Sequence, residues 1–201
     1  MSEADRAAVD AAIAAAEART SAEIHCVLAE SSGDYELPAL VGAVGLALLV
    51  PWPMLAFTLW SAERVFVTQI AVFAVALLVL SIPAIRVALT PPAVKRAQAH
   101  RAAIEQFVLR GVDRSPARSG VLLFASLRER YARVIADEGA AKAIPQAQWR
   151  RVVDAMTGRL ARGEIGPGYA EAASACGDLL AAHFPRDPAA PAKRRDRLHV
   201  V

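Results

Sequence analysis

Two long apolar stretches separated by a short polar link constrain this chain more than any other feature. Residues 37–62 contain no charged side chain, Glu63 and Arg64 follow, and residues 65–85 are again uncharged. A helix of about 20 apolar residues crosses the hydrocarbon core of a bilayer, because each residue adds about 1.5 Å against a thickness of about 30 Å. The sequence therefore predicts two transmembrane helices, Leu37–Trp60 and Val65–Ile85, which the short link forces into an antiparallel hairpin.

These stretches raise the hydrophobic content of the chain to 55% and its mean hydropathy to +0.32. The alternative is two buried helices of a soluble core, but such helices are usually shorter and keep a polar stripe. Pro51, Pro53 and Pro83 lie within or near the ends of the stretches. We expect kinks there, which a membrane helix tolerates.

Basic residues predict the orientation of the hairpin. The link offers only Arg64, whereas the flank after the second stretch carries four cationic residues, Arg86, Lys95, Arg96 and Arg101. Since an excess of cations marks the cytoplasmic face, both termini are predicted to be cytoplasmic, in a bacterial inner membrane. The acidic N-terminus lacks the basic start and apolar run of a cleavable signal peptide.

The rest of the sequence alternates between helical and strand patterns. Apolar spacing predicts helices over residues 4–19, 93–109, 149–160 and 169–184, and strands over residues 23–29, 121–127 and 131–136. A lone strand is unstable, so the first strand is expected to join the other two in one sheet covered by helices. The predicted fold class is α/β, an α/β/α sandwich with a small sheet interrupted by an inserted transmembrane hairpin. Residues 1–36 and 91–185 would form the α/β domain, 37–90 the hairpin and 186–201 a disordered basic tail.

Motifs that carry chemistry are sparse. The sequence has no Gly-x-Ser-x-Gly, His-Glu-x-x-His or Walker motif, and its four histidines lack the spacing of metal ligands. The catalytic candidates are Asp34, Asp137 and Glu138, and the metal-binding candidates are these three with Glu30. They follow predicted strands, and the ends of parallel strands commonly host sites where carboxylates converge. The alternative is that all four are solvated turn residues.

Three segments together resemble a known family. The family's acidic opening helix and first strand are matched by residues 9–28, VDAAIAAAEARTSAEIHCVL. Its next helix, loop, Gly-Val-Leu-Leu strand and hairpin are matched by residues 103–149. The entry to its last helix is matched by residues 162–181, RGEIGPGYAEAASACGDLLA. This order is similar to that of the TPM domain family, which includes thylakoid proteins of photosystem II repair and many bacterial membrane proteins. The resemblance implies an α/β/α sandwich, and for some relatives acid phosphatase activity and calcium binding by acidic residues near strand ends.

The chain departs from the family pattern at two places. Arg118 and Ser119 precede Gly120 where the family usually has an acidic residue and asparagine, and residues 128–130 read Arg-Glu-Arg where acidic residues are common. Both changes remove negative charge that a divalent cation would need. No cofactor is therefore predicted, and calcium is implied by the resemblance alone.

Two functions from different classes follow. The first is a membrane-anchored TPM-like interaction or assembly module, whose partners are the lipid bilayer and another membrane or membrane-associated protein. The alternative is a phosphatase-like or divalent-metal-dependent hydrolase that uses the acidic candidates. A transporter role is disfavoured because the two stretches hold no ionisable residue. The net charge of +3 is too small to indicate a nucleic-acid partner.

Overall fold

The computed structural model of the chain describes residues 1–33, 36–115, 118–186 and 198–201. The chain divides into two compact units. The first, the α/β unit, combines residues 1–32 with residues 98–201, and the second, the hairpin unit, comprises residues 33–97. The first helix and strand therefore belong with the C-terminal half of the chain.

A four-stranded sheet forms the centre of the α/β unit, in the order β3-β2-β1-β4. Its strands are β1 (Ile24–Ala29), β2 (Val121–Ser126), β3 (Tyr131–Ala136) and β4 (Leu198–Val200). β1 is parallel to β2 and β4, whereas β2 and β3 form an antiparallel hairpin. Every residue of β1 and β2 is buried, so both strands are covered on both faces.

The end of the chain differs from the predicted disordered tail. Residues 198–200 form β4, in which Leu198 is buried and its amide donates to Asp10 Oδ1 at 2.8 Å. The Val201 amide donates to the Leu28 carbonyl at 2.9 Å. Pairing of this kind satisfies the backbone groups of β1, which would otherwise be an open sheet edge. The basic cluster of the predicted tail, residues 193–197, lies outside the described residues.

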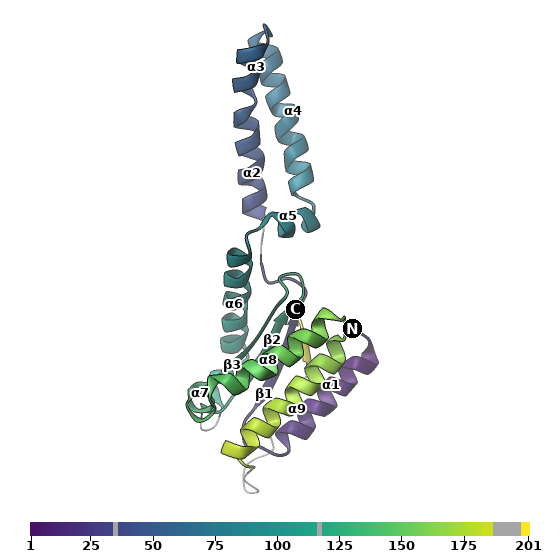
Figure 1. The fold of residues 1–201 in the computed structure, drawn as a ribbon, viewed down its shortest axis with the longest axis vertical. Helices are drawn as coiled ribbons and strands as arrows, with labels where there is room; N and C mark the ends of the chain where they lie inside the picture. The colour runs from purple at the N-terminus through teal and green to yellow at the C-terminus, as the bar shows by residue number, and fades with distance from the viewer. Residues whose placement is uncertain (34–35, 116–117, 187–197) are drawn as a thin grey trace. The chain divides into compact units, whose positions relative to one another are not determined.

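Helices cover both faces of the sheet (Figure 1). Ile24, Cys26 and Leu28 face a core shared with α1 (Glu3–Glu17), α8 (Gln146–Ala161) and α9 (Ile165–His183). Val27 and Phe124 face the opposite side, where Ala103 of α6 (Pro92–Leu109) and Val112 of the 3-10 helix η1 (Val112–Arg114) pack on them. Strand side chains alternate between the two faces, so one strand supplies both cores. The predicted α/β sandwich with a small sheet is confirmed.

Four helices make up most of the hairpin unit: α2 (Glu36–Leu49), α3 (Pro51–Phe57), α4 (Ala62–Leu80) and α5 (Pro83–Leu89). α2 and α3 follow one another and run beside α4 (Figure 1). Small residues line this contact, since Ala39, Ala43 and Ala47 are buried at intervals of four and a Cβ on Gly42 would lie 3.1 Å from Leu80 Cδ1. The second apolar helix ends at Leu80 and not at Ile85 as predicted, because Pro83 begins a separate helix.

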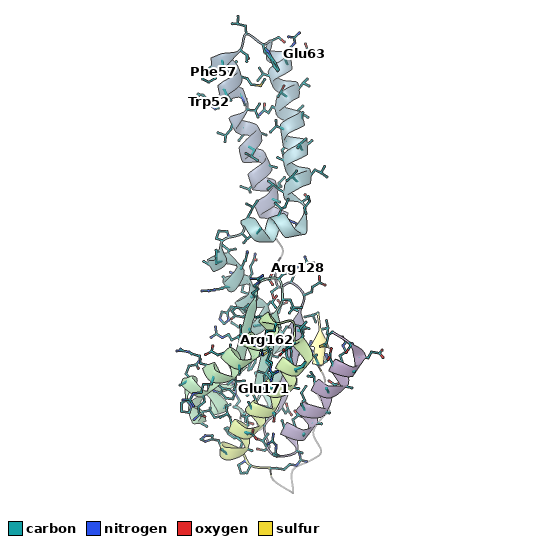
Figure 2. All side chains as sticks on the ribbon, turned by 45° about the vertical axis from the view of Figure 1, so that its right-hand side comes forward. Trp52, Phe57, Glu63, Arg128, Arg162 and Glu171 are labelled. Atoms are coloured by element: carbon teal, nitrogen blue, oxygen red, sulfur yellow. The ribbon has the colours of Figure 1, made fainter. Side chains whose placement is uncertain are left out.

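The large side chains of the hairpin unit point outward. Figure 2 shows Trp52 and Phe57 directed away from the helix pair, and they are 77% and 87% exposed. Residues 39–57 and 62–80 are long and apolar enough to cross a membrane by length and composition.

Candidate functional site

A buried carboxylate organises the polar groups at the carboxyl ends of β1 and β2. Glu129 lies in the turn between β2 and β3 and is 8% exposed. It accepts hydrogen bonds from Ser31 Oγ and the Ser32 amide, both at 3.1 Å, and from Ser126 Oγ. β1 and β2 are parallel and in register, with Ala29 opposite Ser126, so both strand ends reach the same side chain. Glu129 therefore fastens the segment after β1 to the β2–β3 turn.

An ion pair flanks this cluster. Arg128, labelled in Figure 2, donates to Glu30 at 2.8 Å, and both side chains are exposed. An exposed pair of this kind contributes little to stability. Arg130, at the end of the same turn, has a φ of 50°, in the left-handed region that non-glycine residues rarely adopt.

A cavity of about 470 Å³ lies beside this turn, between the β2–β3 hairpin and α8. It is lined by aliphatic residues together with Arg130, Ser126, Thr157 and Tyr131. Among the described residues that line it, none carries a carboxylate, an imidazole or a thiol. The cavity thus offers apolar surface and one cation, without a general acid or base other than the phenol of Tyr131.

The acidic residues predicted to form one site do not all lie together. The Asp137 amide donates to the Gly120 carbonyl at 2.8 Å, at the edge where β2 begins, because the antiparallel hairpin returns the end of β3 to that edge. Glu30 follows the end of β1, so the six residues of β2 separate the two positions by roughly 20 Å. Convergence of Glu30 with Asp137 and Glu138 is contradicted by this geometry. Asp34 lies outside the described residues.

Asp137 acts as the cap of a short helix that the sequence did not predict, α7 (Glu138–Ala143). Its Oδ1 accepts from the Glu138 amide at 2.7 Å and lies 3.0 Å from Arg118 Nη2. Arg118 stands where the family pattern has an acidic residue, so it supplies a counter-charge in place of a second carboxylate. Glu138 is exposed, and a hydrogen bond from Lys142, then the charges of Lys142 and Arg118, lower its pKa.

Other groups that could carry chemistry are separate. Within the described ranges, no three histidine, cysteine or acidic residues are grouped so as to hold a metal ion. Cys26 and Cys176 are buried thiols, and burial raises the pKa of Cys176 to about 12. His100 lies 3.4 Å from Arg133, and burial, followed by the charge of that arginine, lowers the pKa of His100.

Sequence reasoning missed Glu129 as a site residue. The sequence did contain the residues of this cluster. Glu129 stands between two arginines shortly after Ser126, and Ser31 and Ser32 follow β1. Only the parallel register of β1 and β2 shows that Ser31 and Ser32 lie beside Glu129, because Ser32 and Glu129 are 97 residues apart in sequence.

Residues 82–179 match the sequence model of the TPM domain family. By this match, residues 82–179 carry a TPM domain. The matched residues contain β2 and β3, whereas β1 and β4, which complete the sheet, lie outside them. The chain is also similar to the NMR structure of BA42 protein from the psychrophilic bacterium Bizionia argentinensis, with a TM-score of 0.63 and 14% identity, over 100% of this chain and 95% of that one. That likeness concerns the fold. No curated protein matches the chain.

Proposed function

We propose that this protein is a membrane-anchored TPM-domain protein that serves as an interaction or assembly module at the membrane surface. Its hairpin unit inserts into the bilayer, and its α/β unit binds a segment of another membrane or membrane-associated protein. The two roles rest on different observations and are tested separately.

The surface chemistry of the hairpin unit supports insertion. Phe57, Leu78 and Leu55 are 87%, 71% and 70% exposed, which leaves extended apolar area in contact with solvent. Water penalises such area by about 25 cal/mol per Å², whereas hydrocarbon does not. Helices also satisfy their backbone hydrogen bonds internally, as a lipid environment requires.

The composition of the cavity beside the β2–β3 turn is the single observation that carries the binding role. Arg130 offers a fixed charge, while Leu127, Leu160 and Ala161 offer apolar surface. Arginine pairs well with carboxylates, and the aliphatic lining favours a neighbouring apolar side chain. The partner is therefore expected to present an acidic group beside an apolar residue.

Site-specific photocrosslinking in native membranes tests the binding role. A photoreactive residue at Thr157, which lines the cavity, should give a protein adduct, and the matched position Ala155 on the same helix, exposed but outside the lining, should not. Arg130→Glu should abolish the Thr157 adduct by repelling an acidic partner. Equal adducts from both positions, or an adduct insensitive to Arg130→Glu, would remove the cavity as the binding surface.

Cysteine labelling tests insertion and orientation together. A membrane-impermeant maleimide added to intact cells should label Ser61→Cys in the link and should not label Arg96→Cys beyond the hairpin. The native thiols give little background because Cys26 and Cys176 are both 0% exposed. Labelling of Arg96→Cys alone would show that the orientation is opposite to the one proposed. Recovery of the wild type in the supernatant after membrane sedimentation would refute insertion.

A phosphatase-like hydrolase is the second candidate, favoured by the Ser126 hydroxyl that donates to the buried Glu129 carboxylate at the strand ends. An adjacent general base that accepts the hydroxyl proton activates a serine as a nucleophile, and the Glu129 carboxylate would be that base. Turnover of an aryl phosphate, with or without Ca²⁺ or Mg²⁺, should be lost in Glu129→Gln and kept in Asp137→Asn if this cluster is the site. The reverse pattern would move the site to the opposite sheet edge, and no turnover in any condition would remove the hydrolase.

A further inference from the structure

A second cavity, of about 290 Å³, lies entirely within the hairpin unit. It is formed by the beginning of α2, the end of α4, α5 and the first turn of α6. Its lining is largely apolar and includes Leu80, Leu89 and Val94, together with one charged side chain, Arg86. No acidic residue belongs to the described lining.

The cavity lies where both apolar helices end. Ala39, the first residue of the first candidate span, and Leu80, the last residue of the second, both line it. Figure 1 shows α5 at this end of the helix pair. If the hairpin spans the bilayer as proposed above, the cavity lies at the depth of the lipid headgroups, where the hydrocarbon gives way to phosphate.

Arg86 has an unmet requirement in this cavity. Its Nε is buried and has no hydrogen-bond partner among the described residues. A guanidinium stays charged at any physiological pH, so a buried donor of this kind needs an anion or a strong acceptor. The Arg86 carbonyl accepts hydrogen bonds from Thr90 Oγ1 and the Thr90 amide, at 2.8 and 3.1 Å.

We infer that this cavity binds an anionic phospholipid, with the phosphate on Arg86 and the acyl chain along Leu80, Leu89 and Val94. Guanidinium and phosphate match in charge and in bidentate geometry. The absence of a carboxylate from the described lining leaves no partner for the cation of a zwitterionic headgroup. Lys95 and Arg96 follow directly in α6 and add attraction to an anionic leaflet. The inference rests on the proposed membrane insertion.

Lipid retention by the full-length protein tests this site. The protein is reconstituted in vesicles of phosphatidylcholine and phosphatidylglycerol, extracted in mild detergent and analysed by native mass spectrometry. The wild type should retain phosphatidylglycerol in preference to phosphatidylcholine. Arg86→Ala should lower that preference about tenfold, as expected for the loss of one charge-assisted pair. Arg64→Ala, which removes an exposed cation at the link, should leave it unchanged.

Two further variants and one parallel measurement make the result decisive. Arg86→Lys keeps the charge and should retain part of the preference, while Leu89→Trp keeps Arg86 but fills the cavity and should abolish it. Resistance to alkaline extraction from the vesicles reports insertion independently. Inserted wild type with no lipid preference, or a preference unaffected by Arg86→Ala and Leu89→Trp, would overturn the lipid site and leave the anchoring role intact. A wild type that is not inserted would overturn both.

Discussion

The α/β unit and the hairpin unit treat the same kinds of side chain in opposite ways. Phe124, Leu122 and Tyr169 of the α/β unit are 0% exposed, whereas Phe57 and Leu78 of the hairpin unit are 87% and 71% exposed. Helix contacts in both units nevertheless use small residues. Gly177 of α9 meets Ala16 of α1, and Gly42 of α2 meets Leu80 of α4. Close packing between helices is thus common to the two units. They differ in whether their large apolar side chains are buried or exposed.

The largest expected effect comes from emptying the core of the α/β unit. Phe124→Ala removes a fully buried ring of β2 that packs against Ala103 of α6 and contacts Tyr131 edge-on. We expect a loss of about 3–5 kcal/mol in the free energy of unfolding, measured by urea titration of the protein in detergent micelles. Leu78→Ala is the matched control in the hairpin unit and should leave this transition unchanged. Equal losses from both variants would abolish the contrast between the units.

A charge at the centre of the second apolar helix tests the other side of the contrast. Ile70 is 52% exposed, so Ile70→Arg would be nearly neutral if that surface faced water. Inside a bilayer, Ile70→Arg should make insertion less favourable by about 2.5–3.5 kcal/mol, measured by a glycosylation-based insertion assay. Ser61→Arg, in the link, is expected to insert like the wild type. Normal insertion of Ile70→Arg would indicate that a protein partner, and not lipid, covers the hairpin.

The shared packing rule predicts a smaller effect at Gly177. A Cβ there would lie 2.6 Å from Ala16 Cβ and 2.9 Å from Ala16 Cα, so Gly177→Ala must push α1 and α9 apart. We expect a destabilisation of about 1–3 kcal/mol in the urea titration. Gly158→Ala, in α8, is the control because its added Cβ meets nothing nearer than Arg162 Nη1 at 3.9 Å, and it should stabilise the α/β unit by about 0.5–1 kcal/mol. Destabilisation of both variants to the same extent would refute the close approach.

Local pattern was sufficient to predict most of the fold. The lack of charge over residues 37–62 and 65–85 predicted the paired apolar helices, and apolar runs predicted β1, β2 and β3 within one or two residues. β4 was missed because three residues, Leu-His-Val, are too few to show alternation. α7 was missed although Asp137 is a good capping residue, because a helix of six residues has little periodicity.

The candidate site was harder to predict because it depends on long-range register. Asp137 and Glu30 both follow strands. Only the antiparallel pairing of β2 with β3 shows that they lie at opposite ends of β2. Glu129 and Ser31 read as separate polar turns until the parallel pairing of β1 with β2 brings them within 3.1 Å. Side-chain type was visible in the sequence, and side-chain proximity was not.

The smallest expected effect is a pH dependence confined to the α/β unit, since the hairpin unit, residues 33–97, contains no histidine. His199 of β4 lies opposite Val27 of β1. Its pKa falls below the ordinary value of 6.5 because of burial first, then electrostatic interactions with Arg110 and His25, with Asp10 opposing them. The unfolded chain therefore binds a proton more readily than the folded one. The contribution of His199 to stability is complete above pH 6.5 and is lost as the pH falls through the lower pKa of the folded state. Urea titrations on either side of pH 6.5 should show this loss in the wild type and a smaller loss in His199→Gln, whereas extraction of the hairpin from membranes should not change with pH over that range. An identical pH dependence in His199→Gln would mean that protonation of β4 plays no part in it.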